Sequence, residues 1–303
     1  MAAPRPVRGL RASTRLFDAA PVFLAARQSD VASHCGAVAQ RLTPERVHDL
    51  RVALRRLRGA IHLFGKGRPV RRANEETRNF QTALGPLRDL QVQLAGLSKL
   101  LRKVPPEEAA VVQHVRTTLG ATRAAAVEAA RAALQRWDKR CTRTLAALEG
   151  LRPKGRLGGH RVRKRLVRQL EEVEERAQAA LADPGPVPMH QLRIALKRFR
   201  YGLEFLEPAM PDETAEIRNE VVQLQTSLGE LHDLDVQIAL VDQHASPESM
   251  PAAADLLRRL KADRERLGAE LLAVLIHWEE EASALRAQVL LGSSPVRIRG
   301  RMG

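Results

Sequence analysis

A histidine followed by basic residues at helical spacing occurs twice in this chain of 303 residues. The first copy is VHDLRVALRRLRGAIHLFG, starting at Val47, and the second is MHQLRIALKRFRYGLEFLE, starting at Met189. Arginine binds phosphate oxygens through two parallel hydrogen bonds, and lysine binds them as a point charge. The residue types therefore predict a surface that holds a polyanion.

A second pair of segments follows the first at nearly the same offset. FQTALGPLRDLQVQL starts at Phe80, and LQTSLGELHDLDVQI starts at Leu224. The offsets of the two pairs are 142 and 144 residues. Two motifs in the same order predict a tandem duplication, with two halves that are each long enough to bury a core.

Helical geometry places the basic residues of each copy on one face. Each residue of an α-helix turns by about 100°, so the basic residues of the first copy share an arc of roughly 80°. The apolar residues fall on the other side and form the expected buried stripe: Leu50, Leu54, Leu57, Ile61 and Phe64. We call the basic face of the first copy the first ridge: His48, Arg51, Arg55 and Arg58. The second ridge is its counterpart: His190, Arg193, Lys197 and Arg200.

Repulsion within each ridge indicates a ligand. Like charges four residues apart on a helix destabilise it by a few tenths of a kcal/mol per pair, and no acid lies in the stripe that contains Arg51, Arg55 and Arg58. An anion would relieve this repulsion, and the helix N-terminus near His48 or His190 would add a favourable dipole. A solvated basic face without a ligand is the alternative, and the repetition of the pattern counts against it.

Further basic residues outside the two ridges are candidates for contact with the anion. Arg88, followed by Asp89, is a candidate contact, and His232 and Asp233 stand at the corresponding positions. Asp89 and Asp233 are expected to orient neighbouring arginines or to form structural ion pairs. Glu204 replaces His62 in the second copy, which makes that ridge less basic. The secondary candidates are Arg56, His62, Arg161, Lys164, Arg165, Arg168 and Arg198.

The composition of the chain indicates what kind of partner it binds and in which cellular compartment it lies. The net charge is +15, and residues 51–200 carry 33 Lys and Arg against 13 Asp and Glu, whereas residues 201–303 carry 10 against 18. Such a basic centre suits a partner with dense negative charge. Two cysteines imply no disulfide framework, no apolar run is long enough to span a membrane, and Asp18 interrupts the only leader-like segment. We therefore expect a soluble, cytoplasmic protein.

The periodicity is helical nearly throughout, and no stretch alternates as a strand does. Proline, glycine and cap residues predict helices at 13–42, 44–64, 70–103, 107–149, 160–182, 188–206, 212–244 and 248–290. The expected fold class is all-α, with two antiparallel four-helix bundles related by tandem duplication and a pseudo-twofold axis. The expected segments are a disordered N-terminus at 1–12, a first half at 13–150, a second half at 151–292 and a disordered tail at 293–303.

At these motifs the chain resembles a CHAD domain, the conserved histidine α-helical domain. The resemblance rests on the His-x-x-Arg openings of both ridges, and on Leu84-Gly85 and Leu228-Gly229. It implies two four-helix bundles around a pseudo-twofold, with a basic surface or pore that binds inorganic polyphosphate without catalysis, and an association with polyphosphate granules. The contacts that it implies by position are His48, Arg51, Arg55, Arg58, His190, Arg193, Lys197 and Arg200; Arg88 joins them as a candidate.

Two other classes of function are weaker. Nucleic acid is the second choice of partner, because the chain has only 6 Phe, 2 Trp and 1 Tyr to stack on bases. A phosphate-handling enzyme is the third, because the cations of the ridges repel a metal ion and the ridges carry almost no carboxylates. The EEVEER run at Glu171 imitates the ExExK strand of a triphosphate tunnel, but it lies in a helical segment. We therefore expect no enzyme activity, cofactor or metal.

Overall fold

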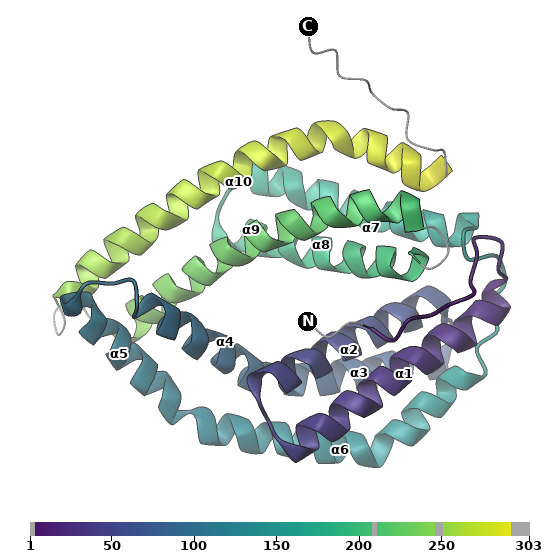
Figure 1. Ribbon diagram of the computed structural model, residues 1–303, viewed down its shortest axis with the longest axis horizontal. Helices are drawn as coiled ribbons and strands as arrows, with labels where there is room; N and C mark the ends of the chain where they lie inside the picture. Colours follow the sequence, from purple (N-terminus) through teal and green to yellow (C-terminus); the bar gives the residue numbers. More distant parts are fainter. Residues whose placement is uncertain (1–3, 208–210, 246–250, 292–303) are drawn as a thin grey trace, which may run out of the picture. The chain divides into compact units, whose positions relative to one another are not determined.

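The computed structural model describes residues 4–207, 211–245 and 251–291, with side chains described outside 211–217 and 279–291. These residues form ten α-helices and no strand, which confirms the all-α fold class (Figure 1). No helix among them combines the length and the apolarity that crossing a membrane requires. The helices are α1 (Leu16–Gln40), α2 (Pro44–Phe64), α3 (Arg68–Ala83), α4 (Gly85–Leu100), α5 (Pro106–Ala121), α6 (Arg123–Glu149), α7 (His160–Ala182), α8 (Pro186–Leu206), α9 (Pro211–His244) and α10 (Ala252–Leu291).

Helix α2, which carries the first ridge, begins and ends where the sequence predicts. The Thr43 hydroxyl accepts the Arg46 backbone N–H at 3.3 Å, and Pro44 follows it at the first helical position. At the other end the Gly65 N–H donates to the Ile61 carbonyl at 2.8 Å. A side chain at Gly65 would collide with Val70, so this turn requires a glycine.

Two of the expected helices are broken in the structure. The helix expected at 70–103 is α3 and α4, which separate at Leu84, and the helix expected at 107–149 is α5 and α6, which separate at Thr122. Pro86 explains the first break, because it has no N–H for the helical hydrogen bond to the preceding turn. At the second break the Thr122 hydroxyl donates to the Leu119 carbonyl at 2.8 Å.

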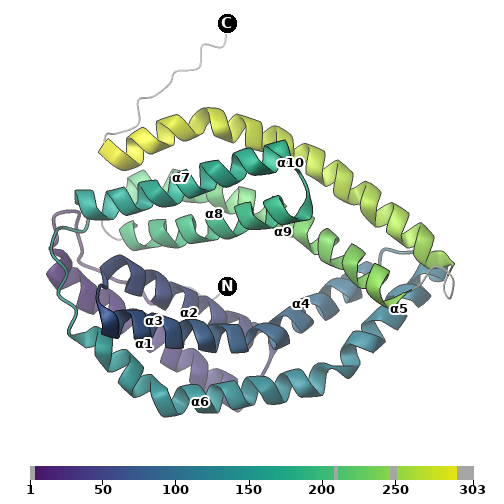
Figure 2. The ribbon, with the colours of Figure 1, turned by 180° about the vertical axis from the view of Figure 1, so that it is seen from behind.

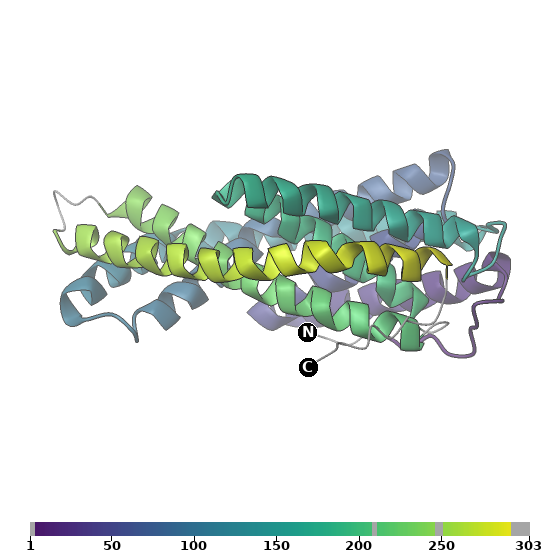
Figure 3. The same ribbon diagram turned by 90° about the horizontal axis from the view of Figure 1, so that it is seen from above.

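The described residues group into two compact units. Unit 1 contains residues 4–7, 17–153 and 230–267, and unit 2 contains residues 8–16, 154–229 and 268–291. Helices α9 and α10 each continue from one unit into the other. Figure 3 shows α10, coloured from yellow-green to yellow, as one uninterrupted helix. The first ridge belongs to unit 1 and the second ridge to unit 2.

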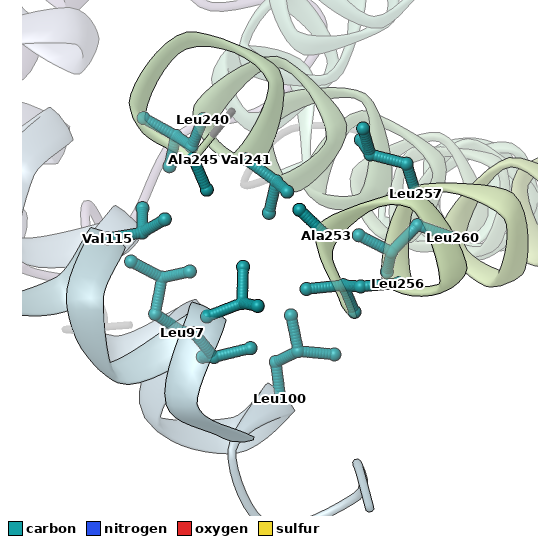
Figure 4. Packing of buried hydrophobic residues seen from close by; sticks show 12 residues of the cluster. Leu97, Leu100, Val115, Leu240, Val241, Ala245, Ala253, Leu256, Leu257 and Leu260 are labelled. Atoms are coloured by element: carbon teal, nitrogen blue, oxygen red, sulfur yellow. The ribbon is translucent and has the colours of Figure 1, made fainter. Parts of the chain in front are cut away.

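Burial of apolar side chains explains why residues 230–267 belong to unit 1. The end of α9 and the start of α10 lie beside α4 and α5 in two opposite views (Figures 1 and 2). One hydrophobic cluster joins the four helices (Figure 4), and its members are Leu97, Leu100, Val111, Val112, Val115, Leu240, Val241, Ala245, Ala253, Leu256, Leu257 and Leu260. The compact units thus do not coincide with the expected halves at 13–150 and 151–292. Those halves describe the duplication in the sequence, and they stay a prediction.

The segment expected to be disordered at the N-terminus is held in place from residue 4 onward. The Arg5 backbone N–H donates to the Asp30 carboxylate at 3.3 Å, and Val7 is buried. In unit 2, the backbone of residues 12–16 bonds to that of residues 155–158, for example from the Leu157 N–H to the Thr14 carbonyl at 2.8 Å. Residues 1–3 and the expected tail at 293–303 lie outside the described residues.

Candidate functional site

The first ridge lies on α2 opposite the stripe of apolar residues that the sequence predicts to be buried. All five residues of that stripe are at most 2% exposed. The ridge residues are half-buried. A rigid apolar back of this kind limits how far the basic side chains can move.

Neutral acceptors from α3 hold two of the ridge arginines. Arg51 donates through Nη1 to the Gln81 carbonyl at 3.0 Å. Arg58 donates through Nη1 to Gln81 Oε1 at 3.2 Å and through Nε to Asn74 Oδ1 at 3.3 Å. Because an amide or a carbonyl carries no net charge, these bonds orient the guanidinium groups without neutralising them.

Helix α4 brings a further cation to the first ridge. Arg88 donates through Nη1 to the Pro44 carbonyl at 3.2 Å, at the start of α2. Burial lowers the pKa of the Arg88 guanidinium, and the charge of Arg55 lowers it further, against a smaller opposing effect of Asp89. The candidate contact Arg88 therefore lies within electrostatic reach of Arg55, and Asp89 partly balances the charge of Arg88.

The pKa of His48 reflects burial and the positive charge of the ridge. Burial lowers its pKa from 6.5 to about 4, and the charges of Arg88 and Arg55 contribute to the shift. The imidazole is consequently neutral at pH 7 and can both donate and accept a hydrogen bond. A cation beside two arginines would be unfavourable there unless an anion were present.

A glycine of the second motif lies beside the first arginine of each ridge. A Cβ added to Gly85 would lie 3.2 Å from Arg51 Nη1, and one added to Gly229 would lie 3.9 Å from Arg193 Nε. Residues 51 and 193 correspond in the first motif, and residues 85 and 229 correspond in the second. This contact is a physical reason for the two motifs to recur together.

The second ridge on α8 differs from the first at its far end. Arg200 is only 7% exposed, its Nε lies 3.8 Å from Glu204 Oε1, and its guanidinium carbon lies 5.0 Å from the centre of the Tyr201 ring. The residue expected to continue the basic face is therefore buried and ion-paired with the acid that replaces His62. The other three members of the second ridge are half-buried.

The secondary candidates of α2 and α8 differ in exposure and in ion pairing. Arg198 is exposed and forms an ion pair with Glu172 of α7 at 2.6 Å. Its counterpart Arg56 is 8% exposed, and His62 is exposed. Arg56 and Arg198 thus lie off the ridge faces, as the helical angles predict.

A groove of about 450 Å³ lies between α4 and the α5–α6 segment, with Leu87, Leu90 and Leu94 in its lining, and no ridge residue lines it. Within the described ranges, no group of three or more His, Cys, Asp or Glu side chains is arranged to hold a metal ion.

Comparison with known proteins gives this arrangement a family. The model of the CHAD domain family matches residues 23–242, a stretch that contains both ridges and both glycines. The chain belongs to the CHAD domain family. No curated protein matches the sequence.

Two solved structures resemble this CHAD domain. One is the crystal structure of the CHAD domain from the plant Ricinus communis, with 25% sequence identity, a TM-score of 0.58, and coverage of 97% of this chain and 98% of the other. The other is PptA from Streptomyces chartreusis, with 18% identity, a TM-score of 0.67, and coverage of 89% of this chain and 99% of the other. The second likeness concerns the fold alone.

Residues that the sequence did not single out help to build the first ridge of this CHAD domain. Gln81 accepts from Arg51 and Arg58, and Asn74 accepts from Arg58. A signal for Gln81 was present, because the repeated motif has a second glutamine, Gln225, at the corresponding position. Asn74 has no such signal in the repeat.

Proposed function

We propose that this CHAD domain binds inorganic polyphosphate through its two basic ridges and does not catalyse a reaction on it. The observation that carries the proposal is the gathering of cations in the first ridge, where burial, and after it the charges of Arg88 and Arg55, lowers the pKa of His48 to about 4. A chain of phosphates supplies negative charge along its whole length, so it can oppose several of these cations at once. Membership of the CHAD family supports the same ligand.

The proposal excludes catalysis on chemical grounds. Hydrolysis of a phosphoanhydride commonly needs a metal ion held by carboxylates beside the phosphate, and the ridge cations would repel such an ion. Incubation of the purified protein with polyphosphate, with and without Mg²⁺, tests this part. Release of orthophosphate above that of a heat-inactivated sample would contradict it.

Where the protein acts is part of the proposal. A polyphosphate-binding module in the cytoplasm would concentrate on granules of its ligand. A fluorescent fusion should therefore coincide with granules in cells that make polyphosphate, and should spread evenly in cells that cannot make it.

Nucleic acid is the competing ligand, and the structure favours polyphosphate over it. Among the nine aromatic residues only Phe17 is exposed, and Arg152 lies 5.3 Å from the centre of its ring. A single-strand binder needs exposed rings on which bases stack. Contact with the nucleic-acid backbone would use the same cations as polyphosphate does, so only direct competition separates the two ligands.

The deciding experiment is a titration with polyphosphates of graded length, beside DNA and RNA at matched salt. We expect affinity to rise with length until the chain covers a ridge, whose residues His48 and Arg58 are about 15 Å apart along the helix axis. The affinity should fall steeply with salt, because phosphate contacts release counterions. Polyphosphate should displace nucleic acid far more readily than the reverse. Tighter binding of DNA or RNA at equal phosphate concentration would contradict the proposal.

Binding should also depend on pH through His48. In the protein without ligand the pKa of the His48 imidazole is about 4. A bound anion favours the charged imidazole, so binding raises the pKa of His48 and is accompanied by uptake of a proton. Affinity is therefore expected to increase by roughly three- to tenfold as the pH falls from 7 to 5. His48→Gln should lose part of this increase, as measured by titration at each pH.

The control for this prediction is His114→Gln, which changes an exposed histidine of α5. Its pH dependence should match that of the unchanged protein. In the absence of ligand, His48 destabilises the fold as the pH falls from about 6.5 to about 4, because the unfolded chain binds the proton there and the folded chain does not. His48→Gln should therefore make acid unfolding begin at a lower pH, and an identical acid transition would contradict the assigned environment.

A further inference from the structure

A second group of cations, on α7 in unit 2, has features of an anion site separate from both ridges. Its residues share one helical face within the first three turns, and we call them the α7 cluster: Arg161, Lys164, Arg165 and Arg168. The cluster extends over about 10 Å of helix, compared with about 15 Å from His48 to Arg58 in the first ridge. Helix α7 has no acid in its first turn and no side-chain cap, since Gly159 occupies the cap position.

Nothing in the described part of the chain neutralises this cluster. Arg161 donates through Nη1 to the Lys154 carbonyl at 3.3 Å, and the other three side chains make no hydrogen bond or ion pair there. Burial lowers the pKa of the half-buried Arg165, and the charges of Arg161 and Arg168 lower it further. No acid and no ridge residue is among the charges that act on Arg165. The charges that lower the pKa of Arg165 therefore come from the cluster itself.

The first half of the chain shows that the fold does not require this arrangement. With the offset of 142 residues, Arg165 corresponds to Phe23, which is fully buried and whose ring centre lies 5.6 Å from that of Phe64. The other three positions of the cluster correspond to Ala19, Val22 and Ala26. An apolar residue thus fits the position in one half, whereas the other half places an arginine there at a cost in desolvation.

We propose that the α7 cluster binds a compact, multiply charged phosphate anion of the tripolyphosphate or pyrophosphate class, independently of the ridges. Three guanidinium groups on one face can each offer two parallel donors to phosphate oxygens. The positive end of the α7 dipole adds to their attraction. The short span of the cluster suits a short anion, and the absence of ridge residues makes this site additional to the proposed polyphosphate surface.

Thermal unfolding with and without tripolyphosphate tests the site, at constant ionic strength. Arg165→Leu removes the half-buried charge, so its Tm without ligand should rise by about 2–4 °C. Tripolyphosphate should raise the Tm of the unchanged protein and leave that of Arg165→Leu much less affected. A Tm rise with ligand that is equal in both proteins would overturn the proposal.

A second variant keeps the test decisive if Arg165→Leu does not fold. The double variant Arg161→Gln/Arg168→Gln should lose roughly tenfold or more in tripolyphosphate affinity by calorimetric titration. Lys139→Gln/Arg143→Gln removes two exposed cations from α6 and is the charge-matched control. Equal affinity in the two double variants would show that only net charge matters, and would refute the site. Long polyphosphate should still bind the α7 variants through the ridges, so failure here is distinct from failure of the proposed function.

Discussion

Replacement of Arg51, Arg55, Arg193 and Lys197 by alanine together should abolish retention of long polyphosphate while leaving the helices folded. A hydrogen bond between charged partners contributes about 1.5–3 kcal/mol, so four lost cations should weaken binding by roughly a thousandfold or more. The slope of log affinity against log salt should fall by about three or four, because fewer counterions are released. Filter retention measures the loss, and far-UV circular dichroism checks the fold.

The matched control removes four exposed cations from one helix away from the ridges: Arg131, Arg136, Lys139 and Arg143 of α6. It has the same net charge as the ridge variant. If both variants lose binding equally, polyphosphate responds to the overall charge and the ridges have no special part. Unchanged affinity in the ridge variant would contradict the assignment of the site.

Phe80→Ala is expected to destabilise the protein strongly near the first ridge. Phe80 is 5% exposed, and its ring stacks on that of Trp137 with the centres 4.8 Å apart and the planes 9° from parallel. Loss of a buried phenylalanine costs about 3–5 kcal/mol. Because Gln81 follows it and accepts from Arg51 and Arg58, the substitution should also weaken polyphosphate binding in the fraction that stays folded. Urea unfolding gives the first effect, and titration gives the second.

Phe80→Leu is the control, because leucine stands at the corresponding position of the second copy, Leu224. It keeps most of the buried apolar volume and should cost clearly less than the alanine. If Phe80→Ala and Phe80→Leu bind polyphosphate with equal affinity, the packing of residue 80 beside Gln81 does not affect the ridge.

Much of this CHAD domain could be predicted from its sequence, because helices impose local rules. The angle of 100° per residue separates the ridge of α2 from its buried stripe, and the structure confirms that stripe. The cap at Thr43 and the stop at Gly65 are likewise local signals. The breaks at Leu84 and Thr122 were missed, although Pro86 was a usable signal for the first.

Contacts between helices were much harder to predict. Nothing in the α8 sequence shows that Arg200 turns into the core while Lys197 stays half-buried, because that depends on the neighbours that pack around α8. The acceptors of Arg58 lie 16 and 23 residues further along the chain, at Asn74 and Gln81. The half-burial of Arg165 could not be predicted from the α7 sequence alone, and the corresponding position of the first half has the buried Phe23.

The sequence by itself determined the all-α class and the two basic faces, and it predicted a polyanionic ligand, because each depends on residue type and on spacing within one helix. Only the tertiary structure decided which cations keep their charge exposed to a ligand. Helix packing brings Arg88 of α4 within reach of Arg55, and it pairs Arg200 with Glu204 in a buried position. It also assigns residues 230–267 to unit 1 through the apolar cluster of α4, α5, α9 and α10. Such contacts depend on which apolar faces bury one another, and residues far apart in the chain determine that together.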